Sequence, residues 1–322
     1  MKNLSILLGV CLVSLSTHAA IPGLQGTYSR LLNSSQMTVL NSDYLANTEK
    51  SCHTALSSMT DGGEISVFVA FGYMDVSLGQ DFPDSNASIF NNGDTLDLDA
   101  EAAFIETLTQ ACRSANSRYG KVKSAACGFR RSGSTLTKTI RDRFTGNNIR
   151  ARIHIVSSSY SSDNQANEST HQNKQQAKSA ATRGAFINAF RSSDAVIYMG
   201  HARSGGGPDF YPPILNNNGH VNYPLYRKNR TGVKDVSSGI RKGSSTKVFA
   251  TLACKSTGLF SSTFRKLLPN SVIVTANDLF DYSDILPTGL NLVEAIVSQR
   301  CDENFSGTTE SYVGGGKLKI FW

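Results

Sequence analysis

Two short apolar stretches decide the fold: AVIYMGH, residues 195–201, and KVFATLAC, residues 247–254. Each stretch has the length and the β-branched or aromatic content of a buried strand. The first ends at His201, and the second ends at Cys254. Because chemistry in an open α/β sheet collects at the carboxyl ends of parallel strands, we expect the imidazole and the thiol to meet in space. Such a pair suits a thiolate nucleophile with a general acid/base.

The segments around these two stretches alternate between strand and helix patterns. Strand patterns occupy residues 149–156 and 271–275, and helical apolar periodicity occupies residues 175–191, 257–268 and 290–298. Residues 149–199 therefore read as a βαβ unit. The alternation predicts an α/β domain over residues 146–302, with a mostly parallel sheet and helices on both faces. The tail, residues 303–322, contributes a possible edge strand.

The preceding segment, residues 20–145, is predicted to be an α+β region, and the sequence assigns it no role. Residues 65–71 read as a strand after a turn. Residues 99–112 read as a helix that either Asp97 or Asp99 can cap. A hairpin follows, in which residues 134–141 pair with residues 149–156 across a Gly-Asn-Asn turn.

Two polar connections interrupt the predicted domain. Residues 157–173 are almost wholly polar, so we expect a loop, placed near the mouth of the site. Residues 204–246 read as a second long connection, of the kind that forms lids or binding loops. It contains three consecutive glycines, residues 205–207, which either let the backbone approach a ligand or form a mobile loop.

The first 19 residues read as a secretory signal peptide. A basic start is followed by an apolar core at residues 6–15 and by small residues before Ala20. No later stretch has the roughly 18 apolar residues of a membrane-spanning helix, so no transmembrane segment is expected. The sequence therefore predicts a secreted or periplasmic protein.

The cysteine count fits an oxidising compartment with one thiol left over. If Cys11 leaves with the signal peptide, five cysteines remain. If Cys254 stays reduced, the other four form two disulfides in one of three pairings. Those four are Cys52, Cys112, Cys127 and Cys301. A catalytic thiol and a buried structural cysteine both satisfy this count.

Composition and charge narrow the class of partner. The chain has 322 residues, is 39% hydrophobic and 18% charged, and can therefore bury a core. Its net charge is +7, and the basic residues read as spread along the chain without a basic helix. We therefore expect no nucleic-acid partner. No cofactor and no metal site are predicted, although a calcium requirement stays open.

The two strand-end motifs resemble those of the caspase-like cysteine peptidases, which include caspases, metacaspases, legumains, gingipains and clostripain. The matching segments are VIYMGH, residues 196–201, and FATLACKS, residues 249–256. The resemblance covers roughly residues 149–300. Caspases proper carry Gln-Ala-Cys-x-Gly, whereas this chain has Leu-Ala-Cys-Lys-Ser, so a true caspase is not expected.

The resemblance implies a peptide or protein substrate and a role for each residue of the pair. Cys254 would attack a peptide carbonyl, and His201 would protonate the leaving amine and then activate water. The backbone N–H groups of Ala202 and Cys254 would form the oxyanion hole, although many members of the family have glycine where Ala202 stands. An acidic substrate pocket for Lys or Arg would come from Asp278, Asp281 and Asp284, which equally fit a solvated loop.

Three functions stay open at this stage. The first is an exported cysteine endopeptidase that cleaves peptide bonds with a Cys-His dyad. The second is a catalytically inactive caspase-like binding or interaction module. The third is a cysteine acyl-transferase or amidase that acts on cell-wall or small amide substrates. His220 is a competing base, ranked below His201 because it follows no strand.

Overall fold

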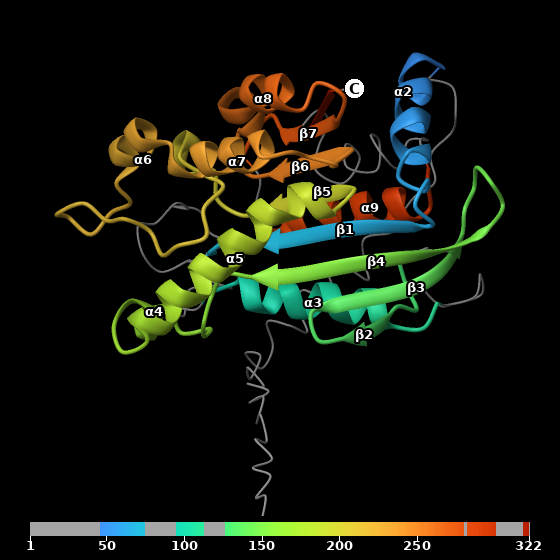
Figure 1. The fold of residues 1–322 in the computed structure, drawn as a ribbon. Coiled ribbons are helices and arrows are strands. Elements are labelled where there is room, and N and C mark those ends of the chain that lie inside the picture. Colours follow the sequence, from blue (N-terminus) through green and yellow to red (C-terminus); the bar gives the residue numbers. More distant parts are fainter. Residues whose placement is uncertain (1–45, 75–94, 113–125, 280–281, 301–317, 322) are drawn as a thin grey trace, which may run out of the picture.

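The computed structural model describes residues 46–74, 95–112, 126–279, 282–300 and 318–321. These residues form one eight-stranded mixed sheet with helices on both faces (Figure 1). In sheet order the strands are β2 (Arg130–Ser132), β3 (Thr135–Arg141), β4 (Asn148–Ser157), β1 (Glu64–Phe71), β5 (Ala195–Met199), β6 (Val248–Leu252), β7 (Val272–Ala276) and β8 (Leu318–Phe321). The predicted α/β class with a mostly parallel sheet is confirmed. The expected signal peptide lies outside the described residues.

β1 occupies the middle of the sheet and is parallel to both of its neighbours. Phe71, its last residue, lies opposite Ser157 of β4 and Met199 of β5. Both faces of β1 are buried, which explains its almost continuous apolar run. The sheet thus includes strands from both sides of the predicted boundary between the N-terminal region, residues 20–145, and the α/β domain, residues 146–302. β4 and β5 are parallel, as the βαβ prediction requires, but β1 separates them.

Helices cover the two faces of the sheet and create two hydrophobic cores. One face carries α2 (Ala46–Ser57), α3 (Asp97–Thr109) and α9 (Tyr282–Val297). The other face carries α5 (Gln172–Ser192), α7 (Thr231–Arg241) and α8 (Ser256–Leu267). In Figure 1, α9 lies behind the sheet and α5 lies in front of it. None of the helices in the described part of the chain is both long and apolar enough to cross a bilayer.

The hairpin and the edge strand are where the sequence places them. β3 and β4 are antiparallel, with Arg141 opposite Asn148 at the turn. β8 is antiparallel to β7 and lies at the edge of the sheet, with Leu318 opposite Ala276. Both predictions are confirmed.

The polar stretch after β4 is partly buried, at Ser157, Ser158, Ser159, Asn164 and Asn167, so the expectation of a loop that does not pack is wrong for its first residues. The carboxylate of Asp97 accepts hydrogen bonds from the Ser158 and Ser159 N–H groups, at 2.9 and 2.7 Å. The Gln175 amide donates to the Ser158 carbonyl oxygen at 2.9 Å and accepts from Tyr160 N–H at 2.7 Å. Side chains from α3 and α5 thus replace water for this backbone. The stretch also contains α4 (Asn164–Glu168).

Two further expectations, the cap of α3 and the long connection over residues 204–246, are wrong. Asp97 does not cap α3, because its carboxylate binds the serine backbone instead; the cap residue is Leu96, without a side-chain hydrogen bond. The connection over residues 204–246 is not a long loop. It holds a 3₁₀ turn, η2 (Arg203–Gly205), and the helices α6 (Tyr223–Asn229) and α7.

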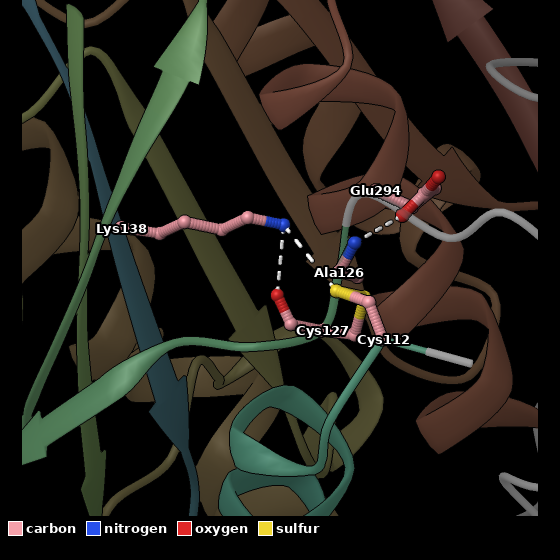
Figure 2. Close-up of a disulfide and its surroundings, with 5 residues drawn as sticks. All are labelled: Cys112, Ala126, Cys127, Lys138 and Glu294. Atoms are coloured by element: carbon pink, nitrogen blue, oxygen red, sulfur yellow. Dashed lines mark hydrogen bonds between the residues drawn. A yellow bond between two sulfur atoms is a disulfide. The ribbon is translucent and has the colours of Figure 1, made fainter. Parts of the chain in front are cut away.

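A disulfide fastens the segment that follows α3. Cys112 and Cys127 are joined, with their Cα atoms 5.1 Å apart. Figure 2 shows Lys138 reaching from β3 to this disulfide, where its ammonium donates to the Cys127 carbonyl oxygen at 2.8 Å. The Ala126 N–H donates to the Glu294 carboxylate of α9 at 2.5 Å. Disulfides are typical of proteins from oxidising compartments.

Of the other described cysteines, Cys52 forms a disulfide and Cys254 does not. Cys52 is disulfide-bonded, and its partner lies outside the described residues, as Cys301 does. Cys254 takes part in no disulfide. The pairing of Cys112 with Cys127 therefore selects one of the three arrangements that the sequence leaves open, provided that Cys11 is removed with the signal peptide.

The first prediction concerns the pH dependence of stability. Burial raises the pKa of Asp97 from 3.8 to about 6. The folded state therefore favours the protonated carboxyl, and the stability from this group is present below pH 3.8 and lost as the pH rises through about 6. Relative to Asp97→Asn, the wild type should lose up to about 3 kcal/mol of unfolding free energy across this range.

Urea unfolding of both proteins between pH 3.5 and about 7 measures this difference. The matched control is Asp61→Asn, because Asp61 is exposed. A difference between wild type and Asp97→Asn that stays constant across the range would contradict the assignment.

Candidate active site

β5 and β6 are neighbouring parallel strands that end at the same level of the sheet. Met199 lies opposite Leu252, and the Gly200 N–H donates to the Leu252 carbonyl oxygen at 3.2 Å. His201 and Cys254 each lie two residues beyond that last pair. Since neighbouring strands are about 4.8 Å apart, the two residues leave the sheet side by side. The structure thus places the histidine and the cysteine that the sequence singles out just beyond the ends of adjacent strands, at one edge of the sheet.

Cys254 lies on the face of the sheet that α3 and α9 cover. Met199 and Leu252, the last residues of β5 and β6, belong to the hydrophobic core on this face. Cys254 packs against this core and is partly exposed. His201 is 8% exposed. The thiol is therefore accessible from solvent, whereas the imidazole is largely covered.

The two residues lie next to the point where the chain reverses its direction across the sheet. From β1 the chain goes to β4 on one side, and it then passes β1 again to β5, β6 and β7 on the other. The helices that follow β1 and β5, α3 and α7, pack on opposite faces. Open α/β sheets bind ligands in the crevice at such a switch point. His201 follows β5 and therefore lies beside this switch point.

A tight turn leads from Cys254 into a helix. Lys255 adopts a left-handed conformation with φ 53°, and its N–H donates to the Asp278 carbonyl oxygen at 2.9 Å. α8 begins at the next residue, and its first turn, which is described in full, contains no acidic residue. The positive end of α8 therefore adjoins the cysteine, where it favours negative charge on the sulfur.

Ser256 fastens this turn to the ends of two strands. Its buried hydroxyl donates to the Thr251 carbonyl oxygen of β6 at 2.7 Å. The same hydroxyl accepts a hydrogen bond from the Ala276 N–H of β7 at 2.8 Å. One side chain thus fixes the position of the cysteine relative to both strands.

Tyr198 does the same for the turn that contains His201. Its buried hydroxyl accepts from the Asp209 N–H at 2.8 Å and lies 3.0 Å from the His201 carbonyl oxygen and 3.1 Å from that of Asp209. Burial raises the pKa of this hydroxyl, so it stays protonated and able to donate. The Tyr73 N–H, at the end of β1, donates to the Asp209 carbonyl oxygen at 3.2 Å.

The glycine-rich segment after His201 is packed against its own backbone. A Cβ on Gly207 would lie 2.6 Å from the His201 carbonyl oxygen, and one on Gly72 would lie 2.4 Å from the Tyr198 hydroxyl. Residues 205–210 are buried. The glycines therefore allow a close approach of the chain to itself, which differs from both readings that the sequence offered.

A buried ion pair closes this segment. The Arg203 Nε lies 3.0 Å from the Asp209 carboxylate, which also accepts a hydrogen bond from the Tyr226 hydroxyl at 3.1 Å. Both charged residues are buried, which requires such pairing. Sequence reasoning missed Tyr198, Arg203 and Asp209. The available signal was a pair of opposite charges flanking a glycine run.

The other predicted site residues are Ala202 of the oxyanion hole and the three aspartates of the substrate pocket. Ala202 is buried, and its carbonyl oxygen accepts from the Gly205 and Gly207 N–H groups. Asp278 is exposed beside the cysteine turn through its backbone contact with Lys255. Asp281 and the side chain of Asp284 lie outside the described residues.

Two further points concern alternative chemistry. His220 is exposed in the turn before α6, where its N–H donates to the side chain of Asn216 at 3.1 Å. The described residues contain no group of three or more His, Cys, Asp or Glu side chains that could hold a metal ion.

Removing the Ser256 hydroxyl should destabilise the fold. Ser256→Ala leaves the buried Ala276 N–H and Thr251 carbonyl without this partner, at an expected cost of about 1–3 kcal/mol of unfolding free energy. Ser262→Ala, an exposed serine of the same helix, should change stability by less than about 0.5 kcal/mol. Urea unfolding measures both variants, and equal effects would show that the Ser256 contacts are unimportant.

Removing the Tyr198 hydroxyl should loosen the turn around His201. Tyr198→Phe keeps the ring but deprives the Asp209 N–H of its acceptor, so hydrogen exchange at that amide should become faster. Tyr226→Phe also deletes a buried hydroxyl but leaves this amide bonded. Exchange of the Asp209 amide measured by NMR separates the two, and an unchanged rate in Tyr198→Phe would contradict this role.

Comparison with known proteins identifies no relative of this chain. The chain matches no protein-family model, and no curated protein or solved structure is significantly similar to it. What the site does is therefore argued from the arrangement of its own residues.

Proposed function

We propose that the chain is a cysteine endopeptidase of the caspase-like type, with Cys254 as nucleophile and His201 as general acid/base. The proposal rests mainly on the parallel pairing of β5 and β6. Both strands end at the same level of the sheet, so His201 and Cys254 follow adjacent strand ends. The absence of a disulfide at Cys254 supports it, because only a reduced sulfur can attack.

The surroundings of each residue suit its proposed role. The amino end of α8 favours the thiolate form of Cys254, which is the reactive species. The mostly buried position of His201 keeps the imidazole in one orientation. The Tyr198 hydroxyl, Gly207 and the Arg203–Asp209 ion pair hold the backbone on which it is mounted. Fixed catalytic groups lower the entropic cost of reaching the transition state.

In the proposed reaction the Cys254 thiolate adds to a peptide carbonyl and forms a tetrahedral intermediate. The protonated His201 gives its proton to the leaving amine, the C–N bond breaks, and an acyl-enzyme on Cys254 remains. The neutral His201 then takes a proton from water, whose oxygen attacks the thioester; the C–S bond breaks, the carboxylic acid is released, and the thiolate and the protonated imidazole are restored. The backbone N–H groups of Ala202 and Cys254 are the proposed oxyanion donors.

The endopeptidase is preferred over the acyl-transferase or amidase and over the inactive module because the resemblance of the two motifs is to peptidases. Asp278 is the described member of the proposed acidic pocket, and it is exposed beside the Cys254 turn. A carboxylate there favours a basic side chain next to the cut.

The test is turnover of a peptide library by the mature protein and its variants. Cys254→Ala should abolish cleavage, and His201→Ala should lower kcat by about 10²–10⁴-fold. His220→Ala, the matched histidine control, should leave kcat unchanged. Circular dichroism of each variant checks that the fold is retained.

A thiol-directed peptide inhibitor followed by mass mapping identifies the reactive residue. Labelling of Cys254 that disappears in His201→Ala would support the dyad. No cleavage and no labelling at Cys254 would favour the inactive module. Cleavage of a cell-wall or small amide substrate without cleavage of any peptide would favour the acyl-transferase or amidase.

A further inference from the structure

Most of the net charge of the chain lies in one short segment. Residues 130–152 contain seven Arg or Lys residues and one acidic residue, while the whole chain has a net charge of +7. The rest of the chain is therefore nearly neutral. The sequence analysis treats the basic residues as spread along the chain, whereas the fold gathers most of this charge on β2, β3, β4 and their turns.

Strand alternation separates the basic side chains onto two faces. Leu136 and Ile140 of β3 point into the core with α3 and α9, and Lys138 points the same way, toward the disulfide (Figure 2). Residues at the intervening positions face the other side of the sheet. Four arginines of β2, β3 and β4 occupy such positions and form what we call the arginine face: Arg130, Arg141, Arg150 and Arg152.

The register fixes the spacing of these arginines. Arg130 and Arg152 both lie opposite Thr137, on either side of it, so they are two strand spacings, or about 10 Å, apart. Arg150 and Arg152 are two residues apart on one strand, which corresponds to about 7 Å. The guanidinium groups thus repeat along and across the strands.

The arginine face is open to solvent and poorly neutralised. Arg130 and Arg141 are exposed, and the side chain of Arg150 is 59% exposed. Glu64 of β1 is the acidic residue that reaches them, at 2.6 Å from Arg152 and 3.6 Å from Arg150. A strong positive potential therefore remains on this part of the sheet.

The side chains between the arginines indicate the kind of partner. Thr135, Thr137 and Thr139 of β3 face the same side and supply a row of hydroxyl groups. Among the described residues of this face, no Phe, Tyr or Trp is exposed, which removes the stacking platform that single-stranded nucleic acids need. The exposed Phe144 lies in the adjoining turn and contacts the ring of His53 edge-on. The part of this face that the structure describes also exposes no large apolar side chain that could enter a membrane.

We propose that the arginine face binds a linear acidic polysaccharide that carries sulfate or carboxylate groups along its length. A guanidinium group can donate two parallel hydrogen bonds to a planar carboxylate or a tetrahedral sulfate. The threonine hydroxyls between them can bind sugar hydroxyls. β1 separates the strands of this face, β2, β3 and β4, from the strands that lead to His201 and Cys254, so binding there leaves the candidate active site open and does not depend on its chemistry.

Titration calorimetry of the whole protein tests the proposal at low and at physiological salt. Heparin supplies sulfate, polygalacturonate supplies carboxylate alone, and dextran is the uncharged control. At least one acidic polymer should bind, more weakly as salt increases, and dextran should not. The triple variant Arg130→Gln, Arg141→Gln and Arg150→Gln should bind at least about tenfold more weakly.

The matched control removes three positive charges from other exposed positions, through Arg227→Gln, Lys234→Gln and Arg241→Gln. It should keep wild-type affinity, as should Cys254→Ala, which makes the result independent of peptidase activity. Equal losses in the two triple variants would overturn the proposal, because net charge rather than this face would then control binding. Tighter binding of single- or double-stranded DNA, or of anionic vesicles, than of either polysaccharide at equal salt would also overturn it.

Discussion

The parallel register between β5 and β6 is the constraint on which the candidate site depends. A shift of one residue would turn one of the two side chains to the opposite face of the sheet. The register is held at both ends: Lys247 N–H donates to the Asp194 carbonyl oxygen at 2.7 Å, and Gly200 N–H donates to that of Leu252 at 3.2 Å. Between these bonds, buried side chains on both faces leave the strands little freedom to slide.

Buried hydroxyl groups fix the backbone of the turns that follow the two strands. Tyr198 binds the backbone after β5, and Ser256 binds the backbone after β6. Each satisfies main-chain groups that the ladder no longer pairs, so the chain can leave the sheet without losing buried hydrogen bonds. The loops that carry the candidate chemistry are therefore as well supported as the strands themselves.

The sequence was sufficient for the elements whose signals are local. The apolar strands before His201 and Cys254, the hairpin of β3 and β4 and the edge strand β8 all follow from short patterns. Features that depend on distant partners were not predictable in this way. The central position of β1 depends on pairing with Ser157 and Met199, and the polar stretch after β4 folds because Asp97 of α3 and Gln175 of α5 supply its hydrogen bonds.

The central position of β1 has a consequence for synthesis of the chain. Its neighbours, β4 and β5, both come later in the sequence, so neither edge of this apolar strand is covered when it leaves the ribosome. A nascent chain or a proteolytic fragment that stops short of β4 exposes both edges, and such strands aggregate. Both edges of β1 can therefore be covered only after synthesis has passed β5, and the sheet is complete only once β8 has been made.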